Sequence, residues 1–572
     1  LAASGAFGNG GTLGAGNDIN ISGGIFANTG TLVASRDIAT QTAGTFTNSG
    51  ALYAGRDQTH RAAGFANQPG GQIWAYRDIV LEGTTAGSNA ASFTNDRATI
   101  DAFAGNLTIR ADVLQNLGAQ PTVTRQPTSA PVGVILYPNQ NWAGSWLPAG
   151  ALITSVVPDP WAYWYSYFTV DAVSPGFVTN PGILRATGNI NLYGNSMVNR
   201  MGQIAAGGNV GLWGGSFDNT GAHLYQTEEK YMMHNCYNCI VIFQGTSTQV
   251  IGAVPSTVSA GGSIVGSLSG GVTNTSGSIP APALQNTAVS VATSAPATTP
   301  TSPSGLSASA SATAAPTTTP IPGGAFNFAG IALPAGPGLF HASPNPHYLI
   351  ETDPRFASLG SFLSSDYLLA RLGVDPAQTQ KRLGDGFYEQ TLVLDEIAQL
   401  TGRRFLSDSR DAQAQYAALM DAGIRLAQAV HLAPGIALTA AQAAALTEDL
   451  VWLEDKTIAG QHVLVPVVYL ARDRSNLQLH GAALVAGNDI GITAGESIAN
   501  GGAIIAGRDL RLAARDLTGS GGGLIAGRDL ALAAGRDLTL AGAGLTAGGN
   551  ASLSAGRDLA LTETRQEIDR RQ

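Results

Sequence analysis

The sequence predicts a mainly β protein: a right-handed parallel β-helix, or solenoid, of about 20 residues per coil, with an inserted small α-helical module and a disordered linker. The motif F-x-N-x-(S/T)-G, followed by aliphatic-x-A-(G/S)-(R/N)-D-aliphatic, returns every 19 to 21 residues at the start of the chain. A unit this short cannot bury an apolar face until a neighbour stacks on it. Three sets of positions share one register: Asp18, Asp37, Asp57 and Asp78; Phe7, Phe26, Phe46 and Phe65; and Asn9, Asn28, Asn48 and Asn67.

Within one coil, apolar residues alternate along two short strands that meet at a corner. Leu32 and Ala34 alternate with other residues, and Ile38 and Thr40 resume the period of two after a turn. Phe46 then fills the core from a third side. Stacked coils would lie about 4.8 Å apart, and the handedness follows from the crossover rule. Equivalent Asn and Asp residues should therefore form ladders, bonded to turn backbone.

A second repeat class lies near the end of the chain, where aliphatic residues carry the core and the Phe and Asn landmarks are absent. Its aspartates are spaced by 20 and by 21 residues: Asp489, Asp509 and Asp529, and Asp516, Asp537 and Asp558. The changes of pattern divide the chain into first-class repeats at 1–118, an aromatic and proline-rich insertion at 119–183, further coils with a C-x-x-C loop at 184–254, a Ser/Thr/Ala/Pro-rich linker at 255–325, a mixed, mostly helical module at 326–475, second-class repeats at 476–562 and a polar tail at 563–572.

The aromatic insertion supplies the candidate receptor contacts. Clustered Trp and Tyr are favoured anchors of binding surfaces because they bury a large area at small entropic cost. The same side chains could instead pack the insertion onto the solenoid, and the sequence leaves both roles open. The candidates are Trp142, Trp146, Trp161, Trp164 and Tyr165.

Cys236 and Cys239 form a lone C-x-x-C. In a secreted chain, a small disulfide loop is the expected state. A metal site completed by His223 and His234 is the alternative, and redox catalysis lacks its usual thioredoxin-like context. We expect no metal site and no cofactor.

Helices are expected only in the module. Thr439 and Gln442 form a capping box ahead of an apolar stripe at Leu446, Leu450 and Leu453. The preceding linker is rich in Ser, Thr, Ala, Pro and Gly with almost no charge, a composition that cannot bury a core. An earlier helical stripe consists of Tyr416, Met420, Ile424, Ala427 and Val430.

Composition excludes several functions. The net charge is −9 and the chain holds 39 acidic against 30 basic residues, so a surface that neutralises phosphates, and with it nucleic acid as a partner, is not expected. No stretch reaches the roughly 18 to 20 apolar residues of a membrane-spanning helix. The chain begins in mid-repeat without a signal peptide, as expected for a fragment of a longer protein.

An enzyme is the main alternative to a binding protein, because β-helix folds also host enzymes that cleave sugars. Such an enzyme needs two carboxylates facing one cleft. Most acidic residues of the module instead fall at helix caps and first turns, where they favourably meet the helix dipole, so we expect no catalytic residues. The residues concerned are Glu351, Asp353, Asp385, Glu389, Asp395 and Glu396.

The chain resembles the large secreted exoproteins of two-partner secretion, the filamentous haemagglutinin and contact-dependent growth inhibition (CdiA-like) family. The two repeat classes are similar to its two haemagglutinin repeat blocks. Residues 347–470 are similar to the segment between those blocks, through the motifs FLSSDY at 362–367, RLGDGFYEQ at 382–390 and LTG at 400–402. The resemblance implies an outer-membrane transporter as a partner and a filament at the surface of a Gram-negative bacterium. It also implies adhesion, or delivery of a toxin into neighbouring cells.

We therefore expect a secreted filament segment that binds a receptor or glycan on a target cell and performs no catalysis. The alternatives are a β-helix carbohydrate-active enzyme and a passive surface scaffold. Loops that interrupt a solenoid present unique surfaces, so the aromatic insertion and the module are the better candidates for recognition. The sequence does not decide between them.

Overall fold

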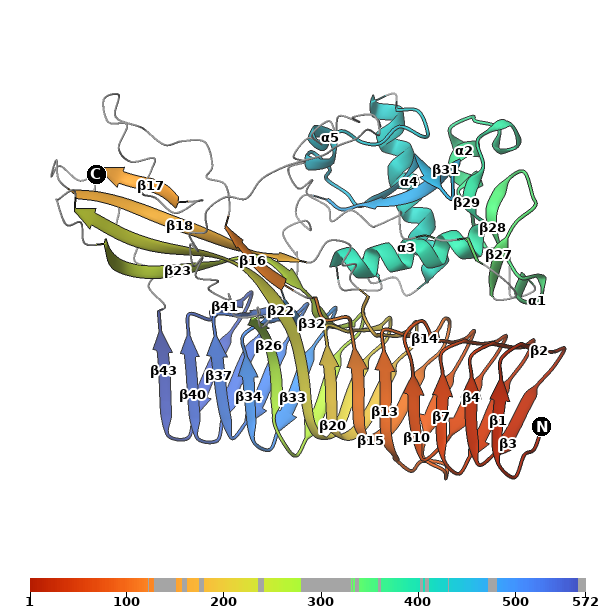
Figure 1. Cartoon of the computed structure of the whole chain (residues 1–572), viewed down its shortest axis with the longest axis horizontal. Helices are drawn as coiled ribbons and strands as arrows, with labels where there is room; N and C mark the ends of the chain where they lie inside the picture. Colours follow the sequence, from red (N-terminus) through yellow and green to blue (C-terminus); the bar gives the residue numbers. More distant parts are fainter. Residues whose placement is uncertain are drawn as a thin grey trace, which may run out of the picture.

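The computed structural model describes residues 1–121, 123–127, 151–156, 162–173, 180–234, 241–278, 331, 333–334, 339–357, 362–401, 405–406, 411–430, 432–471 and 481–563. These residues form one long solenoid, a sheet-like arm that leaves it, and a compact module packed on one of its faces (Figure 1). The predicted β-solenoid with a small helical insertion is confirmed.

One wall of the solenoid, sheet B, is a parallel sheet of 12 strands, to which each coil contributes one strand. Each strand alternates core-facing and outward residues, as the period of two requires. The strands are β2 (Thr12–Ala15), β5 (Thr31–Ala34), β8 (Ala51–Ala54), β11 (Gln72–Ala75), β14 (Thr99–Ala102), β19 (Ile183–Ala186), β21 (Gln203–Ala206), β24 (Ser256–Ala260), β32 (Ala482–Ala486), β35 (Ala503–Ala506), β38 (Gly523–Ala526) and β41 (Gly544–Ala547).

A 26-stranded sheet supplies the other two walls, A1 and A2, and the arm. Wall A1 consists of β3 (Ile19–Gly23), β6 (Ile38–Thr42), β9 (Gln58–Arg61), β12 (Ile79–Glu82), β25 (Ile264–Leu268), β33 (Ile490–Ala494), β36 (Leu510–Ala514), β39 (Leu530–Ala534) and β42 (Ala551–Ala555). Wall A2 consists of β1 (Ala6–Asn9), β4 (Ile25–Asn28), β7 (Thr45–Asn48), β10 (Gly64–Asn67), β13 (Ala90–Asp96), β26 (Val272–Ser278), β34 (Ser497–Asn500), β37 (Asp516–Ser520), β40 (Asp537–Ala541) and β43 (Asp558–Thr562). Three strands run through both walls: β15 (Leu107–Leu117), β20 (Ile190–Arg200) and β22 (Val210–His234).

A single apolar core runs the length of the solenoid, from Ile19 to Leu540. At its start, the rings of Phe26 and Phe46 stack with centroids 4.6 Å apart. The second repeat block continues the first directly, because β32, β33 and β34 pair in parallel with β24, β25 and β26. The two blocks are therefore one structural unit, although the sequence between them runs through the module.

The predicted asparagine ladder is present inside the corner between walls A2 and B. In each step, Nδ2 of one side chain donates to Oδ1 of the next at 2.7–2.9 Å. The ladder also enters the second repeat block at Asn500, so the expectation that the Asn landmark ends before that block is wrong for its first coil. Its members are Asn9, Asn28, Asn48, Asn67, Asn95, Asn116, Asn199, Asn219, Asn274 and Asn500.

The aspartates of the repeats accept hydrogen bonds from turn backbone, as expected. The amide that donates lies in the turn of the following coil. Oδ1 of Asp18 accepts from the amide of Asp37 at 3.2 Å, and Nε of Arg36 donates to the same carboxylate at 2.7 Å. The Arg36 guanidinium lowers the pKa of Asp18. The same arginine-to-preceding-aspartate pairing recurs in both blocks, at Arg56–Asp37, Arg77–Asp57, Arg508–Asp489, Arg528–Asp509, Arg536–Asp516 and Arg557–Asp537.

Three insertions leave the solenoid at one corner, where a strand of wall A2 turns into sheet B. Each returns beside its exit. The amide of Ala119 donates to the carbonyl of Asn180 at 2.8 Å, and the amide of Ala482 donates to Oγ of Ser276 at 2.6 Å. The third insertion is a hairpin, since β22 pairs along its outer part with β23 (Val241–Val254). The coils on either side therefore stack without a gap.

The range predicted as a linker is folded in its first part. Its first part forms a complete coil, β24, β25 and β26, that connects the two repeat blocks. The residues after Ser278, up to 325, lie outside the described part of the chain. This coil resembles a linker in composition because Ser and Gly surround its few apolar core residues, which are Val258, Ala260, Ile264, Leu268 and Val272.

The module pairs helices with a five-stranded sheet, so it is less helical than predicted. The capping box at Thr439 is present, and the stripe on α4 is buried except Val430, which is 42% exposed. The stripe at Leu446, Leu450 and Leu453 is not helical, because β30 begins at Leu450. The elements are α1 (Pro354–Ala357), α2 (Asp366–Arg371), the 3-10 helix η3 (Pro376–Gln378), α3 (Gly386–Thr401), α4 (Ala412–Val430), α5 (Ala440–Ala444), β27 (Phe340–Ala342), β28 (Tyr348–Thr352), β29 (Arg382–Gly384), β30 (Leu450–Ile458) and β31 (Gln461–Tyr469).

Candidate binding surfaces

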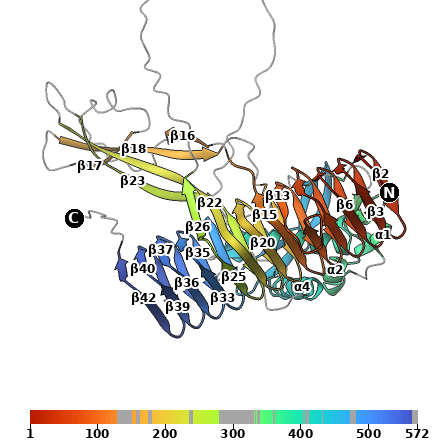
Figure 2. The ribbon, with the colours of Figure 1, turned by 90° about the horizontal axis from the view of Figure 1, so that it is seen from below.

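The arm is an antiparallel sheet built by two of the insertions. β16 (Val123–Pro127) and β17 (Ala151–Val156) both pair with β18 (Ala162–Val173). β18 pairs with the outer part of β22, which pairs on its other side with β23. The arm thus grows from a strand of the solenoid wall and projects away from it (Figure 2). Its backbone is anchored because β22 is continuous from the core into the arm.

The predicted receptor contacts belong to this arm in part. Trp164 and Tyr165 lie in β18, in register with Met232 and Tyr231 of β22. The other three candidates, Trp142, Trp146 and Trp161, lie outside the described residues. Their role in recognition stays a prediction.

The C-x-x-C motif lies between the ends of β22 and β23. Cys236 and Cys239 are outside the described residues, so the predicted disulfide stays a prediction. The flanking His223, within β22, is 3.4 Å from the hydroxyl of Tyr225. In the ranges that the structure describes, no group of three or more His, Cys, Asp or Glu side chains could hold a metal ion.

The module packs on the outer face of sheet B through an aromatic cluster. Trp74 meets the rings of Phe356 and Phe387 edge to face, with centroids 5.8 Å apart in both pairs. Phe103 approaches Phe387 to 4.8 Å. Burial raises the pKa of the Tyr53 phenol to about 12. The cluster joins Val33, Tyr53, Trp74 and Phe103 of the solenoid to Leu339, Phe356, Phe387, Leu394 and Phe405 of the module.

A buried arginine fixes the module beside this cluster. Nη2 of Arg185, on β19, lies 2.9 Å from a carboxylate oxygen of Asp101, and Nη1 pairs with Asp395 of α3. Only 6% of the Arg185 side chain is exposed. Next to it, Nε2 of Gln203 donates to the carbonyl of Ala398 at 3.1 Å. Polar contacts of this kind fix orientation, because leaving the buried guanidinium unpaired would be costly.

The carboxyl groups that an enzyme would use hold the module together instead. Glu389 accepts from the amide and hydroxyl of Ser365 at 2.6 and 2.7 Å and from the Tyr416 hydroxyl at 3.2 Å. Burial raises its pKa to about 8. Glu396 accepts from the amide of Val468 at 2.7 Å, and burial raises its pKa as well. Asp385 caps α3 through the amide of Tyr388; none of these carboxylates lines a described depression.

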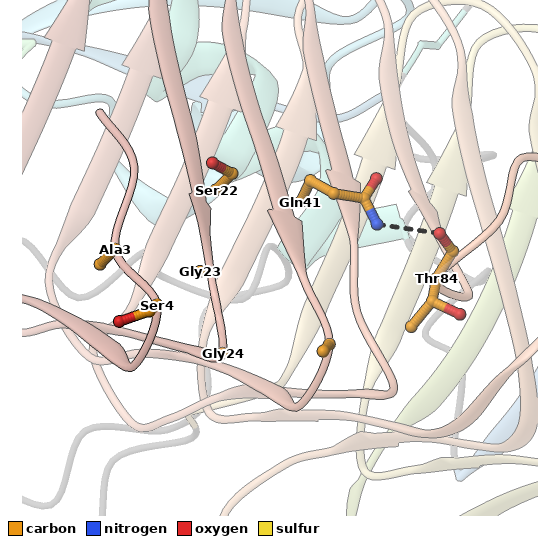
Figure 3. A pocket seen from close by; sticks show the side chains of 8 residues that line it. Ala3, Ser4, Ser22, Gly23, Gly24, Gln41 and Thr84 are labelled. Atoms are coloured by element: carbon orange, nitrogen blue, oxygen red, sulfur yellow. Dashed lines mark hydrogen bonds between the residues drawn. The ribbon is translucent and has the colours of Figure 1, made fainter.

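The two depressions themselves are shallow and open. The larger, of about 580 Å³, lies at the first coils, where Nε2 of Gln41 donates to the carbonyl of Thr84 at 2.9 Å (Figure 3). The smaller, of about 320 Å³, adjoins it and includes Arg61. Neither depression brings two carboxylates together. The larger is lined by Ala3, Ser4, Ser22, Gly23, Gly24, Gln41, Ala43 and Thr84.

The family model described as Haemagglutinin repeat matches residues 1–120, 102–313, 459–521 and 510–564, which is most of the chain. The chain belongs to the haemagglutinin repeat family. The matched residues contain every coil of the solenoid, whereas α1 to α5 lie between the matched segments. The haemagglutinin repeat is therefore the solenoid coil, and the module is an addition to it.

Curated relatives of this haemagglutinin repeat protein match it over about a quarter of its length. "tRNA nuclease CdiA-2" of Burkholderia pseudomallei (strain 1026b) is 47% identical over 161 residues, which are 28% of this chain and 5% of the relative. "Toxin CdiA" of Yersinia pestis is 46% identical over 153 residues, 27% of this chain and 5% of the relative. "Toxin CdiA" of Escherichia coli is 37% identical over 150 residues, 26% and 5% respectively.

The matched stretch thus spans about one-twentieth of the length of these relatives. No solved structure matches the chain. Within the described ranges, no helix is both long enough and apolar enough to cross a membrane.

Sequence reasoning missed the docking face of the haemagglutinin repeats. The signal was present: bulky apolar residues stand at the outward position of consecutive strands of sheet B, at Val33, Tyr53 and Trp74. In a solvated wall these positions would be polar. A row of such residues at a spacing of one coil indicates that something covers the wall.

Proposed function

We propose that the chain is a filament segment of a large secreted bacterial surface exoprotein that mediates adhesion or contact-dependent toxin delivery, through receptor binding and reach rather than through catalysis. One observation carries the proposal: an unbroken solenoid presents two non-repetitive bodies, the arm and the module, from a single corner. The printed names of the relatives, toxin and tRNA nuclease, support the delivery role for the parent protein.

The arm is the proposed receptor contact. The aromatic insertion, whose sequence contains Trp142, Trp146, Trp161, Trp164 and Tyr165, supplies strands β16, β17 and β18 of the arm. The module is the weaker candidate because its aromatic face is already covered by sheet B. The proposed partners are an outer-membrane two-partner secretion transporter and a receptor or glycan on the target cell. The proposed location is secreted or at the cell surface, on the outer membrane of a Gram-negative bacterium.

The two alternatives make different demands. A β-helix carbohydrate-active enzyme would need two carboxylates facing one groove, whereas Glu389 and Glu396 are fully buried in the module. A passive scaffold would bind no ligand saturably. It would also have no evident use for the arm, a sheet that is anchored in the core and projects into solvent. The first observation argues against the enzyme, and the second favours recognition by the arm.

The test is cell-surface binding by the intact chain and by two deletion variants designed from the coil spacing. Joining Leu117 to Gly182 and Gly221 to Ser256 removes the arm and closes both coils. Joining Thr275 to Ala482 removes the module.

The expected result is saturable binding by the intact chain and by the module deletion, and none by the arm deletion. Circular dichroism should show the β-solenoid in all three proteins. Retained binding after removal of the arm would refute its role, and no binding by the intact chain to any target cell would favour the passive scaffold.

A further inference from the structure

Wall A1 carries an aromatic platform on its outer face. In three consecutive coils, the register places Arg110 of β15 beside Tyr193 of β20, and Tyr193 beside Trp213 of β22. The guanidinium carbon of Arg110 lies over the Tyr193 ring, 3.7 Å from its centroid. All three side chains are partly exposed. We call these three residues the platform.

The indole of Trp213 lies along the wall rather than standing on it. A Cβ built on Gly211 would lie 2.6 Å from Nε1 and 3.2 Å from Cε2 of Trp213, so the ring occupies the space that the glycine leaves free. Oδ1 of Asn191 is 2.8 Å from the same point. One face of the indole is thus held against the wall, and the partly exposed side chain offers the other face to solvent.

The polar groups of the platform have no hydrogen-bonding partner among the residues that the structure describes. The guanidinium of Arg110, the Tyr193 hydroxyl and the Trp213 indole N–H make no hydrogen bond to any residue that the structure describes. Among described arginine side chains, only Arg110 and Arg200 make no ion pair with a carboxylate. Glu82, which follows Leu81 on the adjacent strand β12, forms an ion pair with Arg61 at 2.8 Å. The cation of Arg110 is therefore available.

We propose that the platform binds a saccharide that carries a carboxylate. The indole face that points to solvent suits the apolar face of a sugar ring. A guanidinium without a carboxylate partner suits a carboxylate, which it can bind through two parallel hydrogen bonds. Asn191 and the indole N–H are placed beside the ring to bond hydroxyl groups. The carboxylate supplies the negative charge that Arg110 lacks from its own chain. Because the platform lies on wall A1, this site is separate from the arm and does not depend on the arm being a receptor contact.

Calorimetric titration of the whole chain tests the proposal with three soluble probes. The acidic probes are α2,3-sialyllactose and a trimer of galacturonic acid, which represent two sources of the same chemistry, and lactose is the neutral probe. The expected result is saturable binding of at least one acidic probe, about tenfold tighter than lactose and weaker at high salt. Which acidic probe binds identifies the source.

Three variants locate the site. Arg110→Gln should remove the preference for the acidic probe over lactose, and Trp213→Leu should weaken binding of the acidic probe about tenfold. Arg200→Gln is the matched control, since Arg200 is the other unpaired arginine and lies exposed, away from the platform rings. Far-UV circular dichroism should be unchanged in all three.

Two results would overturn the proposal. The first is the absence of saturable binding of either acidic probe by the intact chain in the millimolar range, or equal binding of lactose. The second is a loss of binding in Arg200→Gln that equals the loss in Arg110→Gln, because the effect would then be one of overall charge.

Discussion

Every buried asparagine of the ladder except Asn500, which ends it, connects three coils through one side chain. Asn48 accepts from Asn28 at 2.8 Å, donates to Asn67 at 2.9 Å and also donates to the carbonyl of Gly50 at 3.1 Å. The Asn48 side chain is fully buried. Since buried amide groups need partners, the ladder specifies both the register of the coils and the shape of the corner.

We predict that Asn48→Ala destabilises the solenoid by about 2–3 kcal/mol, because it leaves the amide of Asn28 and Oδ1 of Asn67 without their partner. Hydrogen exchange of the turns at Gly30 and Gly50 should show the loss locally. Asn195→Ala, at an exposed asparagine, is the control and should change little. Equal effects of the two substitutions would refute a special role for the ladder.

His60 is a polar residue in the apolar core. Its Nδ1 lies 2.9 Å from the Thr40 hydroxyl, and its Nε2 lies 2.8 Å from Oε1 of Gln58. Nε2 of Gln58 donates to the carbonyls of Leu52 and Trp74, so its Oε1 is the acceptor and the imidazole carries its proton on Nε2. Burial lowers the pKa of His60 to about 3.

The pH dependence follows from this shift. The folded pKa lies below the unfolded value, so the unfolded state binds one more proton between about pH 6.5 and 3. Stability should fall through this range as pH decreases, by at most about 1.4 kcal/mol per pH unit from His60. The double variant Gln58→Ile/His60→Leu copies the next coil, Ile79 and Leu81, and should flatten the profile. Urea unfolding at several pH values measures the pH dependence of stability. His462→Leu, at an exposed histidine, is the control. If the double variant loses stability with falling pH as steeply as the original protein, His60 is not the cause.

At the scale of elements, the sequence predicts a strand wherever the same residue type returns in every coil. The prediction fails where composition or helical spacing outweighs that repeat. The Ser and Gly content of β24 to β26 predicts a linker there, although Asn274 continues the asparagine ladder. The sequence predicts helix at β30 because Leu450 and Leu453 are three residues apart, and a short apolar run does not distinguish the helical from the strand period. The arm and the platform depend on pairing between residues far apart in sequence, which no local pattern encodes.

The docking of the module depends on the aromatic cluster, and we predict that Trp74→Ala releases it. The substitution removes two edge-to-face contacts and should weaken the docked state by about 3–5 kcal/mol. Faster exchange in α3 and cleavage near the ends of the module should follow, while the coils keep their protection. Ile525→Ala is the matched control, since Ile525 occupies the same outward row of sheet B and is 38% exposed. If both variants leave α3 equally protected, the cluster does not hold the module.

For the whole molecule, the arm and the module both leave the solenoid at one corner, so the solenoid itself stays continuous. Asn274 pairs with Asn500, and Ala483 pairs with Ala503, in adjacent coils. Asn274 and Ala483 therefore occupy the same two positions of a coil as Asn500 and Ala503, which are three residues apart. A chain that joins Thr275 to Ala482 reproduces that spacing, so the solenoid should stack without the module. An insertion whose two ends lie side by side is tolerated, because the asparagine ladder and the strand pairing continue past it. The shaft can therefore acquire or lose recognition elements without refolding its core.

We predict that this module deletion folds but self-associates. Removing the module uncovers the row of Val33, Tyr53 and Trp74 together with Phe103 beside it, a contiguous apolar patch of the kind that drives association. Sedimentation analysis should show concentration-dependent oligomers, and circular dichroism should still show the solenoid. Replacing Val33, Tyr53 and Trp74 with threonine in the same deletion should restore the monomer, because threonine suits an exposed strand. The arm deletion, which leaves the row covered, is the control. A deletion that stays monomeric with the row intact would show that the module is not needed to shield sheet B.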